Sequence, residues 1–175
     1  MALFPPTELP PTELYLIRHG IAAERGTYDR DDDRPLTDAG KERTHAVALR
    51  LLAVGCQADK ILTSPLVRAQ QTAEILLEVG MAPSVAISTN LAPGGQLSDW
   101  LPGLAQWQAE QPAGRLALVG HEPDLSAWAQ QLVTGQVGDR WQLKKAGVIG
   151  LRVPAAATAI GHSELFWLTP PRLLL

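Results

Sequence analysis

The sequence predicts an α/β protein of three layers, with helices on both faces of a mainly parallel sheet and an antiparallel strand pair at the C-terminus. Two observations lead to this fold class. Between about residues 14 and 133, short apolar runs alternate with amphipathic helical segments, which is typical of a parallel sheet covered on both faces. After residue 140, two apolar runs are separated by a stretch too short for a crossover helix, so they are expected to pair antiparallel.

Length and composition indicate one globular domain. A chain of 175 residues is long enough for a single hydrophobic core, and 46% apolar with 19% charged residues excludes wholesale disorder. Residues 5–9 and 10–14 both read PPTEL, whose prolines favour extended backbone. We therefore expect a flexible, proline-rich tail over residues 1–12 and a single domain over residues 13–175.

Charge, apolar run length and cysteine usage limit the classes of partner. The net charge of −3 gives no general attraction to nucleic acid or to an anionic membrane. No apolar run approaches a membrane span and the N-terminus lacks the pattern of a secretory signal, so the cytoplasm is the expected location. Cys56, the only cysteine, excludes an internal disulfide and a multi-thiolate zinc site, and it is expected to be buried.

The first third of the chain contains two clear strands and the helix between them. The apolar runs at residues 14–17 and 60–63 are rich in strand formers and stop abruptly at polar residues. Between them, Thr37 precedes a helical stretch over residues 38–54, and Gly55 closes it. A strand, a helix and a second strand are therefore expected in this order.

A second helix is expected to follow the strand at residues 60–63. Ser64 suits a helix N-cap, Pro65 suits the first helical position, and Gly80 offers a C-terminal stop. One face of this helix carries apolar residues at helical spacing: Leu66, Ala69, Ala73, Leu76 and Leu77.

The rest of the chain continues the alternation and then changes pattern. A weaker strand at residues 85–87 and a helix near residues 97–108 come first, and the run at residues 116–119 is a third clear strand. The final antiparallel pair is expected at residues 148–153 and 164–168. The helix that precedes this pair is marked by Leu125, Trp128, Ala129, Leu132 and Val133.

Polar residues follow each of the three clear strands. In open α/β sheets, ligands bind outside the carboxyl ends of the strands, and this edge is expected to hold Arg18, His19, Ser64, Arg68 and His121. A cation in the first turn of a helix, such as Arg68, opposes the helix dipole unless an anion lies nearby. Arginine can hold two phosphate oxygens at once and stays charged. The sequence therefore predicts an anion pocket that also contains two histidines.

Three segments carry a family resemblance: RHG at residues 18–20, SPLVRAQQTA at 64–73 and GHEP at 120–123. In order and rough spacing they resemble the histidine phosphatase superfamily, which has the phosphoglycerate mutase-like form of the α/β/α fold. The short chain without an inserted cap, RPLTDAG at residues 34–40 and LAPGG at 91–95 look specifically like the SixA branch, the phosphohistidine phosphatases.

The resemblance implies a role for each motif residue. His19 is the expected nucleophile, and Arg18, Arg68 and His121 are expected to hold the phosphoryl oxygens. Gly20 and Ser64 are expected to contact the substrate as well. The reaction would pass through a phosphohistidine on His19, which water then hydrolyses, so neither a metal nor another cofactor is expected.

The substrate follows from a departure from the broader superfamily. Its phosphomonoesterase members carry an acid after the third strand that protonates an alkoxide leaving group, whereas residues 91–95 contain none. The missing acid favours a phosphohistidine protein, such as a histidine phosphotransfer domain of a two-component relay. Asp99 or Glu122 serving as the acid would instead make the chain a small-molecule phosphomonoesterase. A third alternative is a non-catalytic module that binds phosphoproteins.

The remaining charged residues give weaker signals. Asp29, Asp31 and Asp33 imitate the start of a calcium-binding loop, but the glycine and closing glutamate of such a loop are missing, so calcium is rejected. This acidic run is expected to be a solvated loop, or, if it lies beside the pocket, to disfavour anionic substrates or orient a basic protein surface. Lys144 and Lys145 are expected to be surface cations.

Overall fold

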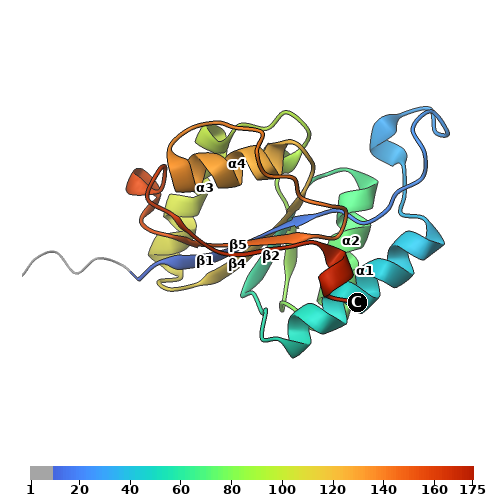
Figure 1. Ribbon diagram of the computed structural model, residues 1–175, viewed down its shortest axis with the longest axis horizontal. Coiled ribbons are helices and arrows are strands. Elements are labelled where there is room, and N and C mark those ends of the chain that lie inside the picture. Colours follow the sequence, from blue (N-terminus) through green and yellow to red (C-terminus); the bar gives the residue numbers. More distant parts are fainter. Residues whose placement is uncertain (1–9) are drawn as a thin grey trace, which may run out of the picture.

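The computed structural model describes residues 10–175 as a six-stranded sheet in the order β3-β2-β4-β1-β5-β6 (Figure 1). The strands β3, β2, β4 and β1 are mutually parallel, whereas β5 runs antiparallel to both β1 and β6. The strand bounds are β1 Thr12–Arg18, β2 Lys60–Thr63, β3 Val85–Ile87, β4 Arg115–Gly120, β5 Val148–Val153 and β6 Glu164–Thr169. The mainly parallel sheet with a C-terminal antiparallel pair is thus confirmed.

Four α-helices cover the two faces of the sheet: α1 Asp38–Ala53, α2 Val67–Glu78, α3 Leu97–Glu110 and α4 Asp124–Thr134. Successive side chains of a strand point to opposite faces. Leu14 and Leu16 of β1 accordingly pack with α3 and α4, while Tyr15 and Ile17 pack with α1 and α2 (Figure 1). The two apolar cores produce the three layers that the sequence predicts.

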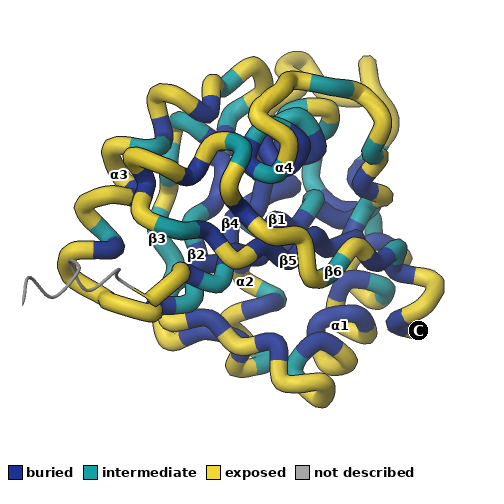
Figure 2. Tube along the Cα trace, turned by 60° about the vertical axis from the view of Figure 1, so that its left-hand side comes forward, coloured by how far each residue is buried: buried dark blue, intermediate teal, exposed yellow. Residues whose placement is uncertain are grey.

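The middle of the sheet is buried and one edge is open (Figure 2). Strands β1 and β4 are buried along nearly their whole length because helices cover both of their faces. Strand β6, at the edge, is mostly exposed. Short 3-10 helices occur at Asp31–Asp33, Thr89–Leu91, Ala156–Thr158 and Pro171–Leu173. No helix within residues 10–175 combines the length and apolar character that crossing a membrane requires.

Most expected element bounds agree with the structure to within two residues, and the helix signals act as predicted. The Thr37 hydroxyl accepts a hydrogen bond from the Gly40 N–H at 3.0 Å and caps α1. Gly55 and Gly80 follow α1 and α2 with φ near +85°, a conformation that glycine adopts without strain. Cys56 is buried, as expected.

Two expectations near the ends of elements need correction. Strand β1 begins at Thr12, a residue expected to belong to the flexible tail. Thr12 is fully buried, and its hydroxyl accepts a hydrogen bond from the Gln108 side chain at 3.2 Å. The remainder of that tail, residues 1–9, lies outside the described residues. Helix α2 begins at Val67, so Ser64 and Pro65 precede the helix and Ser64 is not its N-cap.

Candidate active site

The strands β1, β2 and β4 end side by side, and each is followed by a predicted site residue. Arg18 lies opposite Gly120 and Thr63 lies opposite Val119 in the parallel registers. His19 and Ser64 continue this pairing, because the His19 N–H donates to the Gly120 carbonyl and the Ser64 N–H to the Val119 carbonyl, at 3.1 and 2.9 Å. The structure therefore places His19, Ser64 and His121 together at the carboxyl edge of the sheet.

His19 is buried and held in a defined orientation. Its side chain is only 7% exposed, and its Nδ1 lies 2.7 Å from the carbonyl oxygen of Gly20. Since a carbonyl oxygen can only accept, Nδ1 carries the proton and the Nε2 lone pair is left free. Burial, and then the neighbouring His121 and Arg68, lower the pKa of His19 to about 3, so the ring is neutral at neutral pH. A neutral ring with a free Nε2 is a competent nucleophile.

His121 lies next to His19 from the neighbouring strand end. The two ring centroids are 5.1 Å apart with the planes tilted by 54°. His121 Nε2 lies 2.8 Å from the Ser64 hydroxyl, which is itself completely buried. Burial, followed by the charges of Arg68 and Arg18, lowers the pKa of His121 to about 4.

Ser64 thus has a different role from the cap that its sequence position suggests. Its hydroxyl lies between His121 Nε2 and the backbone N–H of Leu66, which donates to it at 3.3 Å. The pairing with a buried histidine competes with helix capping and holds the hydroxyl at the strand end. Ser64 therefore orients His121, and its contact with a substrate stays a prediction.

Arg68 enters the pocket from the first turn of α2 and is only 3% exposed. Its Nη1 donates to the Asp31 carbonyl at 2.7 Å and its Nη2 to the Asp31 carboxylate at 3.0 Å. Its Nε is buried and has no partner among the described residues. A buried guanidinium N–H without an acceptor costs about 1–3 kcal/mol, which an incoming anion would recover.

Arg18 shows the same pattern from β1. Its Nη1 donates to the Leu143 carbonyl at 2.9 Å, while its Nε is buried and has no acceptor within residues 10–175. Two cationic side chains fixed by their terminal nitrogens, each with a free N–H, surround a neutral histidine pair. This combination is suited to a phosphoryl group, because the charges are already in place before the anion arrives.

A charge network that the sequence spacing does not reveal connects the acidic loop to the pocket. Arg34 is only 7% exposed; its Nε donates to the Asp31 carboxylate at 2.8 Å and its Nη1 to the Ala23 carbonyl at 2.6 Å. The hydrogen bond from Arg34, together with the charge of Arg68, lowers the pKa of Asp31. The acidic loop is exposed, as expected, and its Asp31 carboxylate also serves as the counter-ion of the buried Arg68.

Gly20 serves close packing in this structure. Its N–H donates to the Thr72 hydroxyl at 3.0 Å, and that hydroxyl donates to the Arg68 carbonyl at 2.8 Å. A Cβ at Gly20 would lie 2.3 Å from the Thr44 hydroxyl oxygen, so only glycine fits there. Since the N–H is already engaged, the expected contact between Gly20 and substrate has no direct support from these hydrogen bonds.

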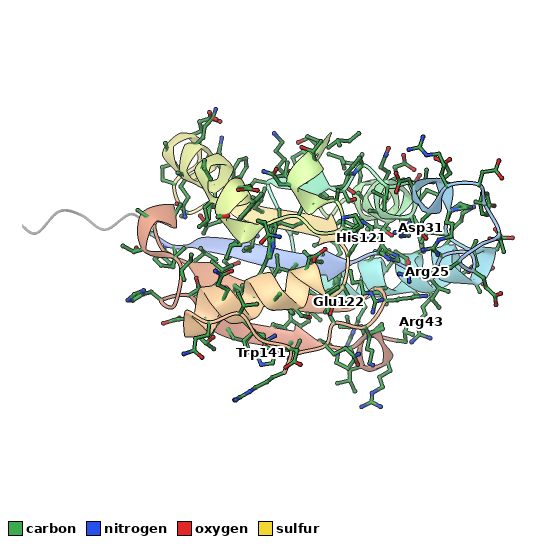
Figure 3. All side chains as sticks on the ribbon, turned by 90° about the horizontal axis from the view of Figure 1, so that it is seen from above. Arg25, Asp31, Arg43, His121, Glu122 and Trp141 are labelled. Carbon is green, nitrogen blue, oxygen red and sulfur yellow. The ribbon has the colours of Figure 1, made fainter. Side chains whose placement is uncertain are left out.

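The two candidate acids differ in their surroundings. Glu122 is half-buried beside His121, its carboxylate accepts from the Ser126 hydroxyl at 2.7 Å, and burial raises its pKa (Figure 3). Asp99 is exposed on α3, and its carboxylate accepts from the Ser98 hydroxyl at 3.3 Å. Glu122 is therefore the better placed of the two.

Within the described residues, no three His, Cys, Asp or Glu side chains gather as metal ligands.

Sequence comparison gives the chain a family. Residues 14–91 match the histidine phosphatase superfamily (branch 1). The chain is 51% identical over 164 residues to an uncharacterized protein of Picosynechococcus sp., which covers 93% of this chain and 99% of the relative. It is 41% identical over 172 residues to the mitochondrial serine/threonine-protein phosphatase Pgam5 of Drosophila persimilis, covering 89% of this chain but only 57% of Pgam5. The chain thus spans little more than half of that second relative.

Structure comparison agrees with this result. The protein histidine phosphatase SixA in complex with tungstate superimposes with a TM-score of 0.81 at 22% identity, covering 93% of this chain and 99% of SixA. The two proteins share a fold, which confirms the α/β/α architecture expected from the motifs. The chain therefore belongs to the histidine phosphatase superfamily, and its enzyme class is that of a phosphatase, as the three motifs predicted.

Proposed function

We propose that the protein is a phosphohistidine phosphatase of SixA type, which hydrolyses phosphohistidine on a protein through a covalent intermediate on His19. The observation that carries the proposal is the neutral, buried His19, with its Nε2 lone pair free between two arginines whose Nε atoms have no partner among residues 10–175. The SixA neighbour is named as a protein histidine phosphatase and Pgam5 as a serine/threonine-protein phosphatase, which supports a protein substrate.

In the first half-reaction, the Nε2 lone pair of His19 attacks phosphorus and the bond from phosphorus to the substrate nitrogen breaks. Arg18, Arg68 and His121 stabilise the negative charge on the equatorial oxygens as the transition state forms. When the substrate ring carries a proton on its other nitrogen, it departs as neutral imidazole and needs no acid. The phosphorylated His19 ring is then cationic, and the Gly20 carbonyl stabilises its Nδ1–H.

In the second half-reaction, water attacks the phosphorus of phospho-His19. The bond from phosphorus to Nε2 breaks, neutral His19 is regenerated, inorganic phosphate leaves, and the proton of the water passes to phosphate or solvent. A ring that is cationic while phosphorylated is a good leaving group, so the same hydrogen bond to Gly20 serves both steps. No step of this scheme calls for a cofactor.

Several finer expectations belong to this proposal. The substrate is a histidine phosphotransfer domain of a two-component relay, the expected location is the cytoplasm, and residues 13–175 act as one domain. The lack of an acid in residues 91–95 supports the phosphoramidate over an ester, because imidazole departs more readily than an alkoxide.

A second candidate function, a phosphomonoesterase, is favoured by one specific observation. Glu122 is half-buried and its pKa is raised, and it lies next to His121 in sequence and close to Arg18 in space. A protonated Glu122 could supply a proton to an alkoxide leaving group. A non-catalytic binding module is less consistent with a nucleophile that is neutral and oriented.

The deciding experiment mixes the protein with phosphoramidate or a phosphohistidine protein, quenches in alkali, and locates phosphate by mass spectrometry. Phosphate on His19 that is absent in His19→Ala supports the two-step mechanism. Faster turnover of sugar phosphates, lost in Glu122→Gln, would replace the first candidate with the second. If the wild type and His19→Ala bound a phosphoprotein equally and neither turned it over, the protein would be a non-catalytic binding module.

A further inference from the structure

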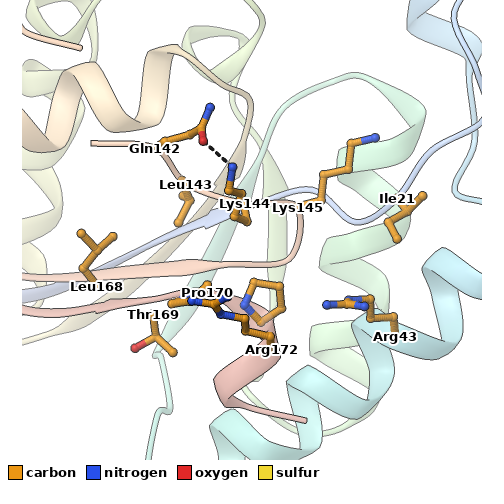
Figure 4. Close-up of a pocket in the computed structure, with 11 residues that line it drawn as sticks. Ile21, Arg43, Gln142, Leu143, Lys144, Lys145, Leu168, Thr169, Pro170 and Arg172 are labelled. Atoms are coloured by element: carbon orange, nitrogen blue, oxygen red, sulfur yellow. Dashed lines mark hydrogen bonds between the residues drawn. The ribbon is translucent and has the colours of Figure 1, made fainter. Parts of the chain in front are cut away.

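A cavity of about 660 Å³ opens beside the candidate active site and takes no part in the proposed chemistry (Figure 4). Four separate segments line it: Ile21 after β1, Arg43 on α1, the loop at residues 142–145, and the end of β6 with the turn that follows it, residues 168–172. In Figure 4 the Arg43 side chain reaches from α1 toward the turn that carries Pro170 and Arg172. This volume is within the range of about 300–1,000 Å³ found for ligand pockets.

The cavity wall is connected to the nucleophile through the backbone. Ile21 is two residues beyond His19, and the Ala146 N–H donates to the carbonyls of Arg18 and His19 at 3.1 and 3.2 Å. The carbonyl of Leu143, a lining residue, accepts from the Arg18 guanidinium at 2.9 Å. A ligand bound in the cavity would therefore lie at a defined distance from a phosphoryl group held at His19.

The cavity is cationic, although the whole chain carries a net charge of −3. Four cations line it and no carboxylate does: Arg43, Lys144, Lys145 and Arg172. Within residues 10–175 none of the four forms an ion pair, and Lys144 donates only to the Gln142 side chain. Burial, and then the charge of Arg18, lower the pKa of Lys145. An anion in the cavity would relieve this repulsion.

Apart from Gln142 and Thr169, the rest of the lining is apolar: Ile21, Leu143, Leu168 and two prolines. A single inorganic anion would use little of this surface. An extended peptide with carboxylates would use both kinds of lining, because its backbone and aliphatic stems would cover the apolar wall while its charges reach cations on separate segments.

We propose that this cavity binds an acidic segment of the protein substrate, next to the phosphorylated side chain. The inference rests on the proposed function, since it names the kind of protein surface that presents phosphohistidine to His19. It also gives Lys144 and Lys145, expected from sequence to be ordinary surface cations, a role in choosing the substrate.

The test uses two phosphohistidine peptides, prepared with phosphoramidate, that differ only in flanking residues: glutamates in one and glutamines in the other. The full-length wild type is expected to show a kcat/KM about fivefold higher for the acidic peptide, because each exposed ion pair between a glutamate and a cavity cation strengthens binding modestly. In the double variant Arg43→Gln/Arg172→Gln this ratio should fall toward one, while turnover of phosphoramidate itself is unchanged.

The control is the double variant Arg50→Gln/Arg152→Gln, which also removes two positive charges but from positions outside the cavity, and it should keep the ratio. Equal rates for the two peptides in the wild type, or a ratio that survives in the double variant, would overturn the proposal. The proposal would also be overturned if the double variant raised KM for small bisphosphates but kept the wild-type ratio of kcat/KM between the two peptides. The cavity would then be a binding site for small phosphorylated molecules.

These readings separate the two proposals. Failure to turn over phosphoramidate or either phosphohistidine peptide would contradict the proposed function. In that case the same two peptides, with phosphoserine in place of phosphohistidine, test the cavity independently. If the double variant loses the preference for the acidic peptide, the cavity proposal is supported; if the preference persists, the proposal is overturned.

Discussion

The active-site pocket and the adjacent cavity are both cationic and lie at the same end of the molecule, yet they hold their charges differently (Figures 3 and 4). Arg68 in the pocket is buried and fixed by Asp31 through two hydrogen bonds. Arg43 and Lys145 in the cavity are partly exposed, and the described part of the chain gives them no ion pair. Fixed, desolvated charges suit a transition state, whereas mobile charges suit the attraction and selection of a partner.

The strongest test of this contrast is loss of the nucleophile. His19→Ala should lower kcat by about 10⁴-fold or more, because no other group can form the covalent bond to phosphorus. Steady-state turnover of phosphoramidate measures this, with circular dichroism as the control for folding. Residual activity within tenfold of the wild type would show that another group attacks phosphorus.

Replacement of one arginine by lysine in each region sharpens the comparison. Arg68→Lys should lower kcat by about 10²–10³-fold, since the compact ammonium lacks the planar fork that holds Asp31 through both Nη atoms and leaves Nε for phosphate. Arg43→Lys, the matched change in the cavity, should leave turnover of phosphoramidate within about twofold. Similar losses in the two variants would mean that the regions do not differ as described.

A smaller effect is expected from the group that orients His121. Ser64→Ala removes the hydroxyl that lies 2.8 Å from His121 Nε2 and should lower kcat by about tenfold, with little change in KM for phosphoramidate. Ser163→Ala, which removes a buried hydroxyl that donates to the Ala159 carbonyl away from the site, serves as the control. An unchanged kcat in Ser64→Ala would show that Ser64 does not orient His121.

The last prediction concerns how the free energy of unfolding depends on pH, and it does not involve activity. His19 and His121 have pKa values of about 3 and about 4 in the folded protein, against an ordinary value of 6.5. Between about pH 4 and 6.5 the unfolded chain therefore binds more protons, so the free energy of unfolding should fall as the pH is lowered through this window, by up to about 1.4 kcal/mol per pH unit for each ring. Urea titrations should give a shallower slope for His19→Ala; equal slopes would contradict the assignment.

Much of the fold was predictable because its signals are local. The apolar runs that form β2, β3 and β5 have the predicted bounds, and Thr37 caps α1 through a contact three residues away. His19, Arg68 and His121 were predictable for a related reason, since parallel strands end at one edge whatever the details of packing.

The remaining site residues depend on contacts that sequence spacing does not reveal. Asp31 meets Arg68 across 37 positions, so an acidic run with local surface character became the counter-ion of a buried arginine. Ser64 followed the local pattern of a cap, but its burial against His121, 57 positions away, gave it another partner. In both cases tertiary contact overrode local propensity.

The hydroxyl of Thr72 links the backbone beside His19 to the backbone of Arg68. It accepts from the Gly20 N–H and donates to the Arg68 carbonyl, and it therefore joins the end of β1 to the first turns of α2. A thermal displacement of the helix would carry both reacting partners in the same direction, so the distance from His19 to a bound phosphoryl group changes less than the position of either element. Loss of this hydroxyl would therefore be expected to loosen the spacing between His19 and Arg68.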